Sequence, residues 1–146
     1  MIIKTVSDFK KFAANIKVDP SMQRRIAWVK KDIEAYIQAL LDGDSVMPIV
    51  LADVRQNLIF AIDNKDLESE RYFEYWQALG GHYLSIDGQN RTKGVIVYLD
   101  DEIRITLSFG GREHHNVLFS ELPLSVQQFL ETRLIYIVVL DNKTRK

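Results

Sequence analysis

Apolar residues recur in the first part of the chain at the three- to four-residue spacing of amphipathic helices. This spacing predicts a first helix with Ser7 as its N-cap and a second helix over residues 28–41, which Gly43 ends. Pro20 separates the two helices, because the residue before a proline disfavours helical backbone. The N-terminal third is therefore expected to be helical.

Two shorter apolar runs follow and predict strands. Residues 47–52 form a nearly continuous apolar run that is typical of a buried strand. Residues 58–62 are expected to pair with it across a turn at residues 55–57. Asp66 or Ser69 then caps another predicted helix, which a pair of glycines ends.

The second half of the chain continues to alternate between strands and helices. Residues 83–86 predict a strand, residues 87–91 a polar loop, and the residues after it a helix that ends near Leu99. The remaining predicted elements are a half-exposed strand over 103–107, a hairpin partner over 116–119, a helix opened by Pro123 and a fully buried strand over 135–140. The pattern indicates an α/β (α+β) fold with a small mixed sheet flanked by helices.

Composition narrows the class of protein. The 146 residues suit a single domain over 1–146, and 47% hydrophobic content excludes a disordered chain. The absence of cysteine excludes disulfide scaffolds and cysteine-ligated metal sites, and it fits a reducing compartment. The longest apolar run is residues 134–140, whereas a membrane-spanning helix needs about 20 apolar residues. We therefore expect a cytoplasmic protein with no membrane segment.

Charge is balanced overall, with a formal net charge of −1, but it is uneven along the sequence. Residues 1–31 carry eight lysines and arginines against two aspartates, and residues 32–75 carry ten acidic and three basic residues. Solvated faces of alternating sign explain this split without any ligand. A basic N-terminal surface that meets the phosphates of a nucleotide or nucleic acid is the alternative.

The polar segment between the strand over 83–86 and its following helix is the first candidate site. Ligands of open α/β sheets gather at the carboxyl ends of strands. Gly88 permits a tight turn, and the N–H groups of the next three residues and the Arg91 side chain suit an anion. Asp87 could bind a metal ion, orient water or cap the helix. A capped turn in which Arg91 pairs with a nearby carboxylate remains the structural alternative.

Two further groups of residues contain candidate chemistry. Gln23, Arg24 and Arg25 precede Trp28, which is expected to lie in the core. Adjacent arginines cannot both face the same way, so one of the two is expected at the surface. The adjacent His114 and His115 are expected to lie at the surface in a turn. A metal site is not favoured there, since no histidine spacing in the sequence matches a zinc protease. The sequence also contains no P-loop and no Gly-x-Ser-x-Gly elbow.

The segment Ile86-Asp87-Gly88-Gln89-Asn90-Arg91 resembles the Asp-Gly-Gln-Gln-Arg signature of the N-terminal domain of GmrSD-type and SspE-type restriction proteins. Other segments stand in the order of that family, so the resemblance covers roughly residues 18–141. Gln23, Arg24 and Trp28 match a Gln-Arg-x-x-x-Trp segment of the family, and Pro48, Ile49 and Leu51 match its Pro-Ile-x-Leu strand. Leu122-Pro123 and the strand predicted over 135–140 resemble a later segment of the family.

The resemblance implies a ParB/sulfiredoxin-like fold and a site that binds and hydrolyses nucleoside triphosphates. Related ParB proteins bind CTP through a Gly-x-x-Arg element, which Gly88 and Arg91 match. By the same resemblance, Asp87 acts in hydrolysis through water or Mg²⁺, and Gln89 is both catalytic and part of the phosphate cradle with Asn90. Gln23 and Arg24 are then a second phosphate contact.

Two departures from the family leave several functions open. Asn90 stands where the family has a second glutamine, so hydrolysis could be slowed or lost while binding survives. The helical region and nuclease domain of the family are absent, so the chain is an excised domain or a small stand-alone relative. The leading hypothesis is a nucleotide-binding domain, with possible hydrolysis, linked to DNA restriction, phage defence or DNA-associated regulation. The alternatives are a non-catalytic module that binds DNA or a partner protein such as a nuclease, and a nuclease-like or other phosphoryl-transfer enzyme.

Overall fold

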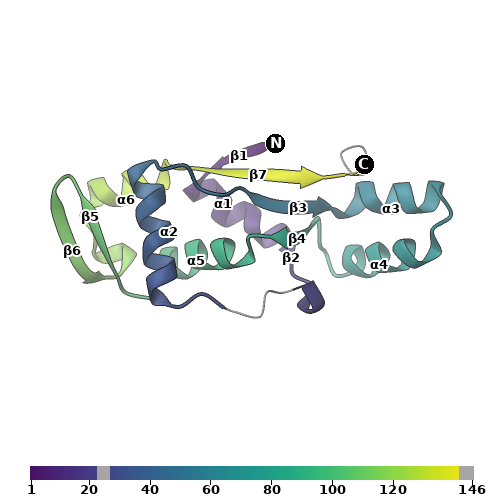
Figure 1. The fold of residues 1–146 in the computed structure, drawn as a ribbon, viewed down its shortest axis with the longest axis horizontal. Coiled ribbons are helices and arrows are strands. Elements are labelled where there is room, and N and C mark those ends of the chain that lie inside the picture. The colour runs from purple at the N-terminus through teal and green to yellow at the C-terminus, as the bar shows by residue number, and fades with distance from the viewer. Residues whose placement is uncertain (23–26, 142–146) are drawn as a thin grey trace.

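The protein is built on a mixed five-stranded sheet, seen in a computed structural model that describes residues 1–22 and 27–141 (Figure 1). The strands lie in the order β1 (Ile2–Thr5), β7 (Leu134–Leu140), β3 (Ile49–Asp53), β4 (Tyr83–Asp87) and β2 (Ile16–Lys17). The pairs β1–β7 and β3–β4 are antiparallel, whereas β3–β7 and β2–β4 are parallel. The predicted α+β class with a small mixed sheet is confirmed.

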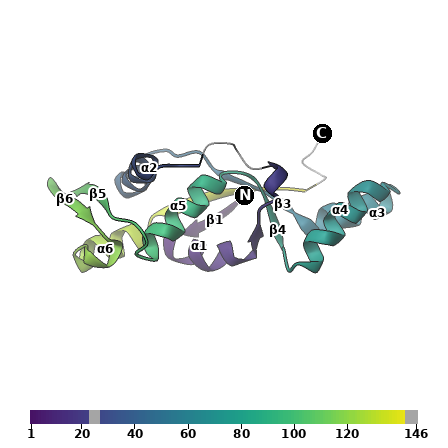
Figure 2. The same ribbon diagram turned by 90° about the horizontal axis from the view of Figure 1, so that it is seen from below.

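The other elements extend from both ends of this sheet. At one end, α2 (Lys30–Asp42), the hairpin of β5 (Ile105–Phe109) and β6 (Arg112–Val117), and α6 (Leu124–Glu131) lie together. At the other end, α3 (Val54–Asp63) and α4 (Leu67–Ala78) form a two-helix arm (Figures 1 and 2). Helices α1 (Val6–Phe12) and α5 (Gln89–Leu99) pack against the middle of the sheet. The short 3₁₀ helices span Ala13–Asn15, Pro20–Met22 and Phe119–Glu121.

Two separate apolar cores hold these parts together. In the main core, the sheet residues Ile49, Leu51 and Ile137 pack with Phe9 of α1 and Tyr98 of α5. The arm has its own small core, formed by Ala52, Val54, Leu58, Phe73, Trp76 and Leu84. The arm is thus fastened to the sheet at its base and leaves its outer surfaces exposed.

The prediction of a strand over residues 58–62 is wrong, as is the turn predicted at 55–57. Both segments belong to helix α3. Its buried positions, Val54, Asn57, Leu58 and Ala61, have helical spacing. The exposed Ile59, Phe60 and Ile62 fill the gaps between them and make the run look continuous.

The N-terminal segment also differs from its prediction. Residues 2–5 form the unpredicted edge strand β1, and Thr5 rather than Ser7 caps α1, because the Thr5 hydroxyl accepts a hydrogen bond from the Asp8 N–H. Ile16 leaves the helical segment and begins strand β2. Each of these strands is at most four residues long, which is too short for a periodic pattern to stand out.

The C-terminal strands are correctly placed in order but not in detail. Strand β6 ends near the start of the predicted partner at 116–119 and consists mostly of polar residues. Strand β7 is not fully buried, since Ile135 and Ile137 are buried while Tyr136 between them is 40% exposed. In the part of the chain that the structure describes, no helix combines the length and the apolar character needed to cross a membrane.

Candidate functional site

The candidate site begins where strand β4 gives way to helix α5. The loop predicted over residues 87–91 is shorter in the structure: Asp87 ends the strand, Gly88 is the only linking residue, and Gln89 opens the helix. The Thr92 N–H donates to the Gly88 carbonyl at 2.9 Å and closes the first helical turn. The predicted loop residues thus become the end of a strand and the start of a helix.

Glycine is required at position 88 for two reasons. Its φ of +101° lies in the left-handed region that side chains disfavour. A Cβ atom there would also lie 3.1 Å from Nη2 of Arg91 and 3.2 Å from Cα of Ile49. Gly88 therefore allows the backbone to turn against β3. It offers no side-chain acceptor to the N–H groups that open the helix, and these have no carbonyl partner within the helix.

The Arg91 guanidinium is held in place beside this turn. Its Nη2 donates a hydrogen bond to the Pro48 carbonyl at 3.1 Å and lies 3.7 Å from Oδ2 of Asp87. Only 15% of the Arg91 side chain is exposed. Arg91 thus pairs with a carboxylate, as the structural alternative expects. The same anchoring also presents a fixed positive charge at the start of α5.

A small hollow lies among these residues. Trp28 and the five residues from Asp87 to Arg91 line a space of about 60 Å³. Trp28, which was expected in the core, packs against the main core but is only partly buried, and it lines the hollow. A water molecule needs roughly 10–15 Å³, so the hollow has room for several waters or a small anion.

Several buried polar atoms near the hollow have no hydrogen-bond partner among the described residues. They are Oε1 of Gln89, Nε of Arg91, Oγ1 of Thr92 and the hydroxyl of Tyr36. Burial raises the pKa of Tyr36 to about 12, and the charge of the nearby Arg91 opposes this shift. Three of these atoms belong to the first four residues of α5, and the fourth belongs to α2, which packs against α5. Because buried polar groups are nearly always paired in folded proteins, we expect these atoms to bind waters or a ligand.

Most of the predicted site residues are brought together, and two fall outside the described residues. Asp87, Gly88, Gln89, Asn90 and Arg91 surround the same hollow. Gln23 and Arg24 lie in the segment 23–26, which the structure does not describe.

The fit of Mg²⁺ to this site depends on one carboxylate. Within residues 1–22 and 27–141, no three His, Asp or Glu side chains gather as a metal-binding group. Asp87 lines the hollow and is partly exposed. Mg²⁺ is commonly bound through one or two carboxylates together with substrate phosphates. Asp87 therefore fits as a protein ligand to a Mg²⁺ ion that arrives with a phosphate chain.

The sequence prediction did not identify Tyr36 as a site residue. Its position in the apolar stripe of α2 indicated a core residue, and its ring does pack there. The ring centroid lies 5.5 Å from that of Trp28, which lines the hollow. A tyrosine in a stripe otherwise made of isoleucine, leucine and valine is the one signal that could have found it.

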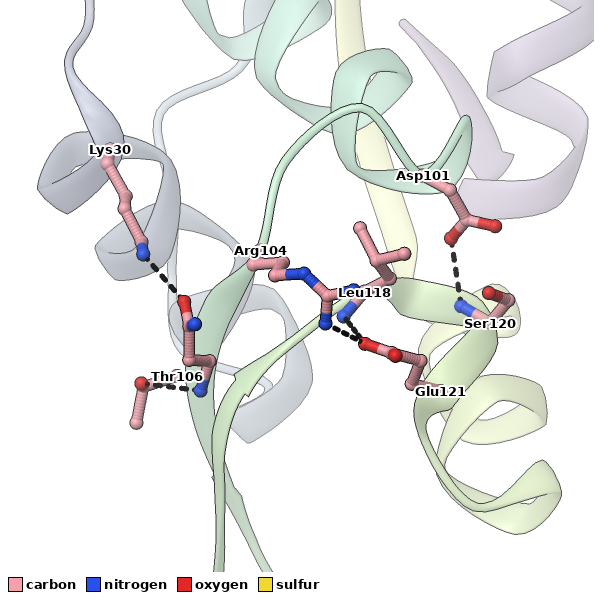
Figure 3. A network of polar contacts seen from close by, with 8 residues as sticks. Lys30, Asp101, Arg104, Thr106, Leu118, Ser120 and Glu121 are labelled. Carbon is pink, nitrogen blue, oxygen red and sulfur yellow. Dashed lines mark hydrogen bonds and ion pairs between the residues drawn. The ribbon is translucent and has the colours of Figure 1, made fainter.

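Two other polar groups have structural roles or surface positions. The adjacent His114 and His115 lie on strand β6 rather than in the turn predicted for them. Figure 3 shows Lys30, Arg104 and Glu121 in a separate surface network. Lys30 donates to Asn116, and Arg104 pairs with Glu121, which also accepts from the Leu118 N–H. These bonds fasten the β5–β6 hairpin to α2 and to the segment that precedes α6.

Comparisons with known proteins do not place the chain in a family. No family model matches the sequence, and neither the curated proteins nor the solved structures contain a match.

Proposed function

We propose that this protein is a nucleoside triphosphate-binding domain whose phosphate site is the start of helix α5. One observation carries the proposal: a glycine-linked helix start without a side-chain cap lies beside the fixed guanidinium of Arg91. Helix N–H groups and an arginine fork are the two donor types that phosphate groups prefer. The buried polar atoms without partners at the same place add support.

The residues of the turn divide into binding and catalytic roles. The backbone from Gly88 to Asn90 and the Arg91 side chain hold the phosphate chain. The Asp87 carboxylate would repel a bound phosphate unless a cation or a water lies between them, so its role is in hydrolysis. Oε1 of Gln89, which has no hydrogen-bond partner among the described residues, is an acceptor that can hold the attacking water.

The metal ion and the second phosphate contact complete the proposed site. Mg²⁺, when bound, would neutralise charge on the phosphates, with Asp87 as its protein ligand. Gln23 and Arg24 would add phosphate contacts, as the family resemblance implies. The shorter Asn90 amide makes slow hydrolysis the expectation.

The cellular setting of this proposal has less support. The resemblance to restriction proteins favours a DNA-linked role in restriction, phage defence or regulation, with DNA or a nuclease as partner. The ParB/sulfiredoxin-like relationship has the same support, together with a mixed sheet flanked by helices. A sequence without cysteine suits the reducing cytoplasm.

A second function, a non-catalytic protein-binding module, is favoured by the arm. Ile59, Phe60 and Ile62 of α3 are each between 43% and 49% exposed, within little more than one helical turn. Clustered exposed apolar residues often mark binding surfaces. In this case nucleotide binding would be absent, and a partner protein would cover α3.

Calorimetric titration of each nucleoside triphosphate, with and without Mg²⁺, tests the leading function. We expect Arg91→Ala to weaken binding roughly tenfold to a hundredfold, because a charge-assisted hydrogen bond is lost. Arg112→Ala, which removes an exposed arginine of the hairpin, is the matched control and should bind like the parent. Equal binding by Arg91→Ala, folded normally, would contradict the phosphate site.

Phosphate release separates binding from hydrolysis. Asp87→Ala should keep or improve binding in the absence of Mg²⁺ and lose any turnover of the parent. A variant that still releases phosphate at the parental rate would remove Asp87 from the proposed mechanism.

A further inference from the structure

Tyr36 carries a buried hydroxyl that makes no hydrogen bond within the described part of the chain. The residue is 7% exposed and packs within the main core, yet its hydroxyl has no hydrogen-bond partner among the described residues. Leaving a buried hydroxyl unpaired costs free energy, whereas phenylalanine at the same position would cost nothing. A ligand that accepts a hydrogen bond from this hydroxyl would offset that cost.

The neighbours of Tyr36 include residues that line the hollow, although Tyr36 itself is not among the lining residues. Its ring centroid lies 5.5 Å from that of Trp28, and its helix α2 packs against α5, the helix that carries Arg91. Both Trp28 and Arg91 line the hollow. Nε of Arg91 is a second buried donor without a partner at the same place.

The size of the hollow limits what can enter it. Sites that enclose a whole small-molecule ligand measure roughly 300–1,000 Å³, whereas this hollow measures about 60 Å³. A terminal phosphate group fits such a space, but a sugar and a base do not. The base would then lie outside the hollow, where the donors described above cannot recognise it.

We propose that the end of the phosphate chain enters the hollow and accepts hydrogen bonds from the Tyr36 hydroxyl and from Nε of Arg91. This inference rests on the proposed function and deepens it: the hollow recognises a polyphosphate end and discriminates little among the bases. The ligand class is then any chain of two or more phosphates with a free end, with or without a nucleoside.

Tyr98 provides a matched control for Tyr36. It is also buried, also carries a hydroxyl without a partner among the described residues, and packs against Phe119. It lies nine residues after Gln89 on α5, about 13 Å along the helix axis. Replacing either tyrosine by phenylalanine removes an unpaired hydroxyl, so both variants should unfold at the parental temperature or above it.

The experiment measures calorimetric binding of inorganic tripolyphosphate and of the four nucleoside triphosphates to the parent, Tyr36→Phe and Tyr98→Phe. We expect tripolyphosphate to bind the parent within a few fold of the nucleotides. Tyr36→Phe should bind every one of these ligands about tenfold more weakly, and Tyr98→Phe should bind like the parent.

The possible failures are distinguishable. If nucleotides bind the parent but tripolyphosphate does not, or if Tyr36→Phe binds like the parent, the inference is overturned and the proposed function stands. If the parent binds neither kind of ligand, the proposed function fails and the inference fails with it. If Tyr36→Phe unfolds well below the parent, the hydroxyl has a partner in the free protein and the inference is overturned.

Discussion

Two neighbouring strands of the sheet each end in an aspartate that leads into a helix, and the two turns have different properties. At the end of β3, Oδ1 of Asp53 accepts a hydrogen bond from the Gln56 N–H at 2.8 Å and caps α3. At the end of β4, Gly88 stands between Asp87 and α5, so the glycine occupies the capping position. The Asp87 carboxylate instead lies 3.7 Å from Arg91.

The difference shows how one residue separates a structural turn from a candidate binding site. An N-cap carboxylate occupies the N–H groups that would otherwise attract an anion. Inserting a left-handed glycine at the capping position of α5 means that the cap residue itself supplies no side-chain acceptor. An aspartate at the end of a strand thus caps the following helix after β3 and does not occupy the capping position after β4, where we propose the phosphate site.

The largest expected effect comes from removing the glycine that makes the two turns differ. Gly88→Ala adds left-handed strain and a Cβ in close contact with Ile49 and Arg91. We expect a loss of about 2–4 kcal/mol in the free energy of unfolding, measured in urea. Gly110→Ala is the control, because its φ is +60° but no described atom lies within 4 Å of the added Cβ. An equal loss in both variants would show that crowding at Gly88 contributes nothing.

A third aspartate sharpens the comparison, because its carboxylate is entirely structural. Asp19 accepts hydrogen bonds from the Tyr72 hydroxyl at 2.6 Å and from the hydroxyl and N–H of Ser21. These bonds, the one from Tyr72 first, hold the pKa of Asp19 below its ordinary value. Its contribution to stability is therefore fully present above the ordinary pKa near 4 and is lost as pH falls through the lowered pKa of the folded state.

Tyr72→Phe tests this linkage. At pH 7 we expect a loss of about 1–2 kcal/mol, since a hydrogen bond to a charged group is removed. The difference between parent and variant should shrink as the pH falls from about 4 through the lowered pKa of Asp19 in the folded state, because the carboxylate becomes protonated. Thermal unfolding followed from pH 7 to pH 2 measures it, and a difference that stays constant over this range would remove Asp19 from the explanation.

A smaller effect on stability is expected at the capped turn. Asp53→Ala should cost about 1 kcal/mol, as is usual for the loss of an N-cap, and should leave nucleotide affinity unchanged. Chemical denaturation and calorimetry on the same variant provide the two readings. Weakened nucleotide binding in Asp53→Ala would contradict the division between a structural and a functional aspartate.

The smallest signal is spectroscopic. Trp28 lines the hollow, whereas Trp76 is buried in the core of the arm. In Trp76→Phe, the emission of the remaining Trp28 should change when nucleotide is added, and in Trp28→Phe the emission of Trp76 should not. Confirmed binding without any change in Trp76→Phe would mean that the ligand does not approach Trp28.

Sequence patterns predicted the fold best where burial alone determines the spacing. The helix that became α5 was expected despite three consecutive β-branched residues, and its apolar face does pack in the main core. The pattern failed at α3, where Ile59, Phe60 and Ile62 are exposed although apolar. The spacing of apolar residues indicates a helix only when the solvent-exposed positions are polar, and on α3 several exposed positions are apolar.

The residues of the candidate site from Asp87 to Arg91 could be predicted from the sequence, but the groups that pack around them could not. Gly88 and Arg91 stand out in a sequence because glycine and arginine have distinctive backbone and charge properties. The Pro48 carbonyl that accepts a hydrogen bond from Arg91 is a backbone group, so the identity of the residue does not reveal it. Tyr36 reaches the site through packing of α2 against α5, and such a contact depends on tertiary structure alone.

Amide chemical shifts test the contrast between the two turns most directly. A two-dimensional ¹H–¹⁵N NMR titration of the protein with a nucleoside triphosphate reports on every backbone N–H at once. We expect the largest shifts at residues 88–91, at the uncapped start of α5, and none at residues 54–57, where Asp53 caps α3. Shifts centred on the start of α3, or no shifts at residues 88–91 at saturating nucleotide, would contradict the account.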